Sequence, residues 1–100
     1  MSDLIRITKV EPRDRRWLRL WFSDGAVKDV DVGEVVSQGR VFAEINRDDA
    51  AFARVRVNDE SGTVEWPGGI DLDPLVLYGR FEPDSGLRIE RRVIRPPLAA

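Results

Sequence analysis

The chain has 100 residues, of which 42% are apolar and 34% are charged, and its formal net charge is −2. These values are ordinary for one soluble globular domain, and no apolar run approaches the roughly 20 residues of a membrane-spanning helix. Cysteine is absent, which excludes disulfides and thiolate chemistry, and the first residues lack the apolar section of a signal peptide. We therefore expect a cytoplasmic protein that does not act at a membrane.

Histidine is also absent from the sequence. Its absence removes the commonest general base, the usual nucleophilic triads and most transition-metal sites. We therefore predict a protein that is not an enzyme and that has no cofactor, no catalytic residue and no metal site.

The first third of the chain predicts a three-stranded antiparallel meander over residues 4–32. Residues 4–11 are rich in β-favouring side chains, and the charged segment from Pro12 to Arg16 suits a turn. Residues 17–32 then read as a hairpin folded on Ser23-Asp24-Gly25, because Asp and Gly tolerate the positive φ that a tight turn needs.

The first strand of this hairpin is apolar on both faces. One face receives Trp17, Arg19 and Trp21, and the other receives Leu18, Leu20 and Phe22. An apolar face is stable only when it is covered. We therefore expect a helix, the C-terminal tail, a second chain or a ligand over the tryptophan side.

Short helices and a second hairpin are expected from residue 34 to residue 79. Residues 34–38 suit one helical turn closed by Gly39, and Val41, Phe42 and Ile45 suit a second turn packed on the sheet. A helix is predicted over 48–54, with Asp48 as its cap and Phe52 as its anchor.

The second hairpin is predicted over residues 55–66, with its turn at 58–62. Trp66-Pro67-Gly68-Gly69 ends its second strand. Asp73 and Pro74 then begin another short helix, which ends at Gly79.

The last twenty residues form an extension with its own predicted strand at 87–94. Leu87, Ile89 and Val93 fall on alternate positions, and Pro96-Pro97 ends the run. This strand would extend the sheet, cover the tryptophan face, or do either in a neighbouring molecule as an exchanged dimer. The sequence therefore predicts one α+β domain over 1–80 and an extension over 81–100. Its fold would be an antiparallel sheet of about five strands with two or three short helices.

These segments resemble the domain of unknown function 2442 family, small bacterial proteins with one compact α+β domain. The resemblance spans about residues 5–78, in the family's order and close to its spacing. It is carried by Phe22-Ser23-Asp24-Gly25, Val30-Asp31, Val41-Phe42 with Ile45, Phe52 with Val55, Trp66-Pro67-Gly68-Gly69-Ile70-Asp71 and Leu77-Tyr78. Position 68 more commonly holds Asn in the family, and here it is Gly.

The resemblance implies no catalytic residue, because the family has no established activity. Some members are fused to a helix-turn-helix DNA-binding domain or are encoded beside small proteins, as in toxin–antitoxin pairs. The family context therefore implies a regulatory or partner-binding role by analogy. After Tyr78 this chain has a short arginine-rich strand in place of a helix-turn-helix pattern, which argues against direct reading of DNA.

The carboxylates allow one other chemical interpretation. Asp71 and Asp73, with Glu65 nearby, would suit a hard divalent cation, and the protein would then be a cation-dependent carboxylate enzyme. Asp73 is already explained as a helix cap, Asp71 as a partner of the turn amides at Gly68-Gly69, and Asp24 as a turn residue. We therefore interpret the motif residues as structural: Phe22, Asp24, Gly25, Trp66, Pro67, Gly69, Asp71, Asp73 and Tyr78.

The remaining question is what the tryptophans and arginines contact. Core packing is the first interpretation of the three tryptophans. A protein-binding surface is the second, formed by Trp17, Arg19 and Trp21 or by Leu87, Ile89 and Val93. The third is nucleic-acid binding through Arg13, Arg15, Arg16 and the arginines of 88–95. We expect self-association or a small protein partner, because a small core gains stability from association.

Overall fold

The computed structural model describes residues 5–38, 42–80 and 88–98. Within them the chain forms seven strands, four short helices and a 3-10 turn at Asp14–Arg16. The strands are β1 (Ile7–Pro12), β2 (Trp17–Phe22), β3 (Val27–Asp31), β4 (Arg56–Asn58), β5 (Thr63–Trp66), β6 (Ile70–Leu72) and β7 (Arg91–Arg95). The helices are α1 (Gly33–Val36), α2 (Ala43–Arg47), α3 (Asp49–Phe52) and α4 (Pro74–Tyr78).

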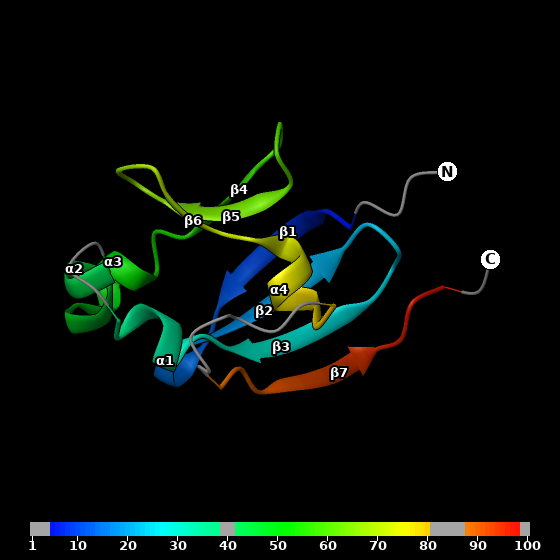
Figure 1. Ribbon diagram of the computed structural model, residues 1–100, viewed down its shortest axis with the longest axis horizontal. Helices are drawn as coiled ribbons and strands as arrows, with labels where there is room; N and C mark the ends of the chain where they lie inside the picture. The colour runs from blue at the N-terminus through cyan, green and yellow to red at the C-terminus, as the bar shows by residue number, and fades with distance from the viewer. Residues whose placement is uncertain (1–4, 39–41, 81–87, 99–100) are drawn as a thin grey trace.

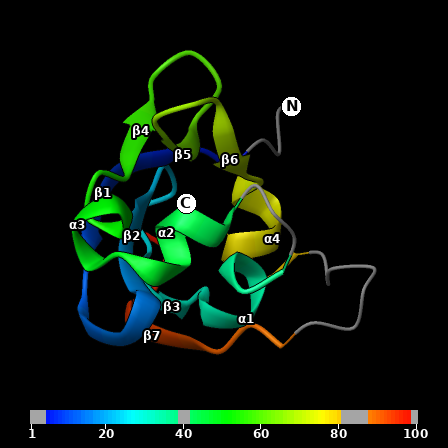
Figure 2. The same ribbon diagram turned by 90° about the vertical axis from the view of Figure 1, so that its left-hand side faces the viewer.

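The strands form two antiparallel sheets, one ordered β1-β2-β3-β7 and the other β4-β5-β6 (Figure 1). The α+β class is confirmed, but the expected single sheet of about five strands is divided into two. Among the described residues, the β4–β5 hairpin does not pair with the large sheet, and it gains a third strand, β6. Gly68 and Gly69 both have positive φ and reverse the chain into a further strand, where the sequence analysis expected the strand simply to end. Figure 2 shows the helices and the small sheet on one side of the large sheet.

The predicted meander and its hairpin turn are confirmed. Arg19 of β2 lies opposite Asp29 of β3, and β1 pairs antiparallel with β2 on the other side. In the turn, the Asp24 carboxylate accepts the amide of Ala26 at 2.9 Å, and Gly25 adopts a φ of 91°. Local side-chain chemistry therefore sets the register of the large sheet.

The core lies between the two sheets and the helices. Trp66 is 1% exposed and its indole Nε1 donates to the carbonyl of Phe52 at 2.9 Å, which joins β5 to α3. The core also contains Leu18, Leu20, Phe22, Val30, Val36, Ile45, Val64 and Leu77. Every strand except β7, and each of the four α-helices, thus places at least one apolar side chain in or against this core.

Two of the predicted helix caps are confirmed. The carboxylate of Asp48 accepts the amide of Ala50 at 2.9 Å, and that of Asp73 accepts the amide of Leu75 at 2.8 Å. Gly79 ends α4 in the left-handed region, at a φ of 107°. Two of the predicted residues, Gly39 and Val41, lie outside the described residues.

The C-terminal strand extends the sheet of its own chain. β7 pairs antiparallel with β3, so that Arg92 lies opposite Asp29 and Val93 opposite Lys28. It therefore does not lie across the tryptophan face, which was one of the predicted arrangements. None of the helices in the described ranges has the length and apolar content that crossing a lipid bilayer requires.

Candidate functional site

The side of the large sheet turned away from the helices, here called the outer face, holds most of the predicted contact residues. Side chains directly opposite on neighbouring strands share one face of a sheet. By this register the outer face comprises Lys9, Glu11, Trp17, Arg19, Trp21, Asp29 and Arg92. Both tryptophans are half-buried, whereas Leu18 and Leu20 on the inner side of the same strand are 0% exposed.

A row of alternating charge crosses the outer face. Glu11, Arg19, Asp29 and Arg92 lie opposite one another along the four strands. Arg19 donates from Nε and from a terminal nitrogen to the two carboxylate oxygens of Asp29, at 2.8 and 3.0 Å. These hydrogen bonds hold the pKa of Asp29 below its ordinary value and raise the pKa of Arg19. The face therefore presents both signs of charge.

Each outer tryptophan has a cation over its ring. Lys9 Nζ lies 4.6 Å from the ring centroid of Trp21, and the Arg92 guanidinium lies 4.7 Å from that of Trp17. A side chain of the C-terminal strand β7 therefore reaches Trp17, and neither tryptophan is fully buried. The rings keep part of their surface in water.

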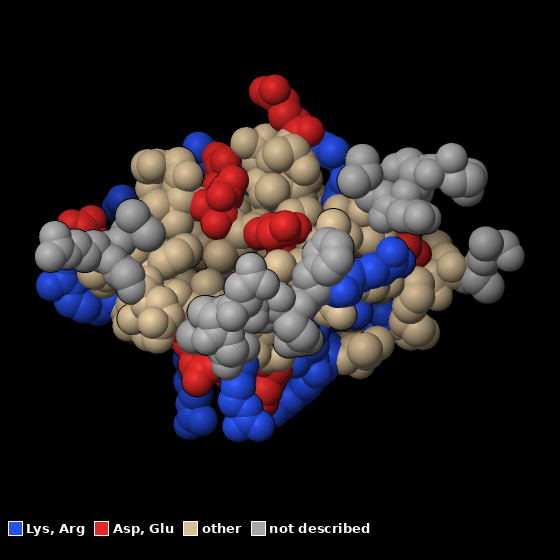
Figure 3. Space-filling model, viewed as in Figure 1, with Lys and Arg blue, Asp and Glu red and all other residues tan. Residues whose placement is uncertain are grey.

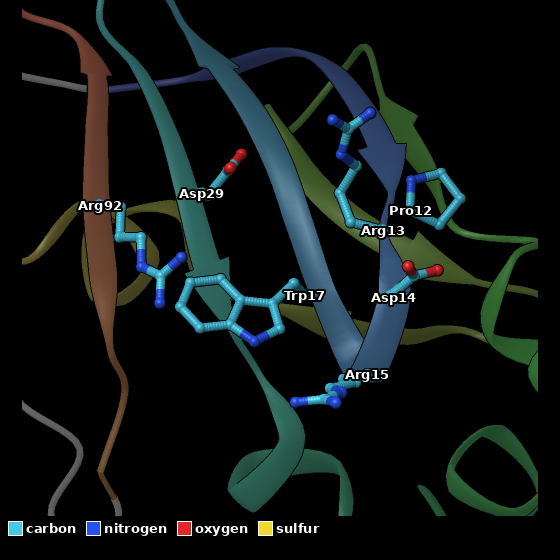
Figure 4. Close-up of a pocket in the computed structure, with 7 residues that line it drawn as sticks. All are labelled: Pro12, Arg13, Asp14, Arg15, Trp17, Asp29 and Arg92. Carbon is cyan, nitrogen blue, oxygen red and sulfur yellow. The ribbon is translucent and has the colours of Figure 1, made fainter.

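An open hollow with a volume of about 530 Å³ lies beside Trp17 (Figure 4). Its lining residues are Pro12, Arg13, Asp14, Arg15, Trp17, Asp29 and Arg92. Figure 4 shows the guanidinium of Arg92 pointing from β7 toward the indole, with Arg15 on the other side of the ring. The arginine-rich turn and the arginine-rich tail thus meet at one tryptophan.

The turn that supplies Arg15 has an unusual backbone. Arg15 and Arg16 have φ values of 60° and 67°, in the left-handed region that residues other than glycine rarely adopt. Arg16 is held on the other side of the turn, where it donates to the Asp49 carboxylate at 2.7 Å and to the Asn46 carbonyl at 2.5 Å. The sequence analysis grouped Arg13, Arg15 and Arg16, but Arg16 does not line this hollow.

The acidic residues near β6 have different hydrogen-bond partners and do not form one cluster. The Glu65 carboxylate accepts from Arg56 at 3.0 Å and from Asn58 at 2.9 Å, and Asp73 caps α4. Asp71 is exposed and shares a small hollow with Asp73. Within the described ranges, no three histidine, cysteine, aspartate or glutamate side chains come together as a metal site would require. The geometry thus gives no support to the cation interpretation.

The aromatic motif residues fasten α4 to the hairpin. The Tyr78 hydroxyl donates to the Asp24 carboxylate, which raises the pKa of Tyr78, and its ring meets that of Phe22 edge-on at 4.9 Å. Lys28, which the sequence analysis did not single out, donates to the Tyr78 carbonyl at 2.6 Å, and burial lowers the pKa of Lys28. Because Lys28 alternates with Asp29 along β3, its inward position follows from the strand period.

The predicted contact residues of the C-terminal segment do not share one surface. Ile89 is a buried member of the core, while Val93 is 61% exposed. Leu87 lies outside the described residues. Figure 3 shows Lys and Arg side chains with Asp and Glu side chains between them along the lower edge of the view, where Figure 1 places β7.

Comparison with known proteins places these features in a family. The family model described as protein of unknown function DUF2442 matches residues 7–83. The crystal structure of NE0471 from Nitrosomonas europaea, described as a candidate DNA-binding protein, is 32% identical in sequence and gives a TM-score of 0.67. That match covers 78% of this chain and 50% of the other, so the chain spans about half the length of NE0471. Among curated proteins no match was found.

Proposed function

The chain belongs to the domain of unknown function 2442 family, and from this premise we propose that it is a non-enzymatic protein-interaction module of the bacterial cytoplasm. Its contact surface is the outer face of the large sheet. The observation that carries the proposal is the placement of Trp17 and Trp21, both half-buried, on the side of β2 opposite the core residues Leu18 and Leu20.

Tryptophan and arginine are the side chains most often found at the energetic centres of protein interfaces. On the outer face they alternate along β2 as Trp17, Arg19 and Trp21. Arg19 is already held flat on the sheet by two hydrogen bonds to Asp29. A partner therefore meets an ordered surface and loses little side-chain entropy in binding it.

The partner is a small protein or a second copy of the chain. Acidic and basic side chains alternate across the outer face, so any partner must present both signs in register. A protein surface can do so, whereas a nucleic-acid backbone presents only negative charge.

A nucleic-acid-associated regulator is the second candidate. It is favoured by the description of NE0471 as a candidate DNA-binding protein and by Arg13, Arg15 and Arg92 around one tryptophan. Asp14 and Asp29 line the same hollow, and the chain carries a net charge of −2, so both local and overall charge oppose it.

The proposal is tested by recovering the tagged chain and its Trp21→Thr variant from the source cells and measuring the mass and composition of each complex. Threonine keeps the strand propensity but removes the ring. Arg56→Ala, on the small sheet, is the matched control. We expect the wild type and the control to carry the same partner, or to form the same oligomer, and Trp21→Thr to lose it.

Two results would contradict the proposal. One is a wild-type chain recovered as a monomer with nothing bound. The other is a folded Trp21→Thr variant, shown by its circular dichroism, that keeps the wild-type complex. Retention on immobilised DNA that steepens as salt is lowered would favour the second candidate instead.

A further inference from the structure

We infer that the hollow beside Trp17 anchors the partner by receiving a carboxylate side chain from an acidic peptide segment. The inference rests on the proposed function and adds to it the chemistry of the partner at one position. Two arginines without a direct ion pair, two apolar lining residues and the backbone of the Arg15 turn support it.

Two arginines of the hollow make no direct ion pair, although Arg92 lies opposite Asp29 and acts on its charge at longer range. Among the described residues, neither Arg15 nor Arg92 forms an ion pair or a hydrogen bond with an acidic side chain. The Arg92 guanidinium lies over the Trp17 ring, and Arg92 also lines the hollow. A guanidinium edge presents N–H groups in the geometry that a carboxylate accepts.

The backbone at Arg15 is strained for a residue other than glycine. A non-glycine residue in the left-handed region is strained, and the next residue, Arg16, is in the same region. Glycine or asparagine would occupy Arg15's position without this strain. Because the Arg15 side chain is exposed and does not contribute to the core, the conformation serves to aim its charge at the hollow.

The hollow fits a peptide carboxylate better than a chain of phosphates. Trp17 and Pro12 give it an apolar wall, which suits the carbon atoms of a glutamate or its neighbours. Asp14 and Asp29 line its other parts and would repel any further anion, so the hollow admits one carboxylate beside the arginines more readily than a row of closely spaced phosphates. Its volume of about 530 Å³ is in the range of small-ligand sites, so a few side chains fill it.

The test uses the full chain labelled with ¹⁵N and hexaglutamate peptide as the probe, at low ionic strength. The three tryptophans give three indole N–H signals, each reporting one place in the fold. We expect the Trp17 signal to move in a saturable way. The Trp66 signal should stay still, because its indole is buried and bonded to Phe52.

Two variants test whether the shift of the Trp17 signal comes from binding in the hollow. Arg15→Gly removes the charge and keeps a residue that accepts the left-handed backbone. We expect it to weaken hexaglutamate binding about fivefold, the value of roughly 1 kcal/mol for one exposed charge pair. Arg92→Ala should weaken binding to a similar extent. Arg54→Ala is the matched control, since Arg54 is equally exposed but lies after α3, and it should leave the affinity unchanged.

Three outcomes would overturn the inference. They are an unmoved Trp17 signal, equal affinities for Arg15→Gly and the wild type, or tighter binding of oligothymidine than of hexaglutamate at the same Trp17 signal. If Trp21→Thr loses the cellular complex while Arg15→Gly and Arg92→Ala keep it, the outer face remains the contact surface and only the carboxylate anchor is wrong.

Discussion

The two faces of β2 share one backbone but have opposite surroundings. Leu18 and Leu20 on the inner side are 0% exposed and lie under the helices and the small sheet. Trp17 and Trp21 on the outer side are half-buried beneath single cationic side chains. The inner side therefore carries the stability of the domain, while the outer side is available for recognition.

Truncating the inner side should have the largest effect. Leu20→Ala removes a fully buried side chain and leaves a cavity, which costs about 2–5 kcal/mol of the free energy of unfolding. Urea unfolding followed by tryptophan fluorescence measures this loss. Val93→Ala is the matched control, because Val93 is 61% exposed. A loss below that of the control would mean that the inner side is not the core.

The same test on the outer side should show a smaller cost. Trp21→Thr removes a ring that is only half-buried and one cation–π contact with Lys9, for a loss of about 1–2 kcal/mol. Urea unfolding followed by circular dichroism measures it. A loss equal to that of Leu20→Ala would show that the outer face is as much a part of the core as the inner one.

The ion pair of the outer face gives a pH test. Because the pKa of Asp29 is lowered in the fold, the pair stabilises the chain at pH values above the ordinary aspartate pKa. That stabilisation is lost as pH falls through the lowered pKa of the folded state. Arg19→Ala should therefore have a melting temperature that falls less between neutral and acidic pH. Parallel curves for the two proteins would show that the pair contributes nothing.

The smallest expected effect is at the strained turn. Arg15→Gly relieves a left-handed non-glycine residue but increases the freedom of the unfolded chain, so the net change should be a gain or loss within about 1 kcal/mol. Thermal unfolding followed by circular dichroism measures it. A loss of several kcal/mol would mean that the Arg15 side chain supports the fold, which would remove it as a free binding group.

Local patterns in the sequence were enough to predict much of the fold. The alternation along β2, the Asp24-Gly25 turn and the Asp73-Pro74 helix start all involve residues within a few positions of one another. The β5–β6 hairpin was missed because Pro67-Gly68-Gly69 either ends a strand or reverses it. The choice depends on whether Val64 and Trp66 can pack against Leu72 and Ile70 across the two strands.

The candidate site was harder to predict, because it depends on contacts between residues far apart in the chain. The importance of Trp17 was visible from the sequence, but its neighbours Arg15 and Arg92 are brought to it by the β1–β2 turn and by the pairing of β7 with β3. The separation of Arg16 from Arg15 likewise depends on Asp49, which lies 33 residues away in the chain.

The sequence by itself determined which side chains share a face and where the chain turns, because strand period, turn chemistry and helix caps act over a few residues. Only the tertiary structure decided which face is covered, how the strands divide into two sheets, and which arginines meet Trp17. Those outcomes depend on contacts between segments far apart in the chain, whose formation is a property of the whole fold.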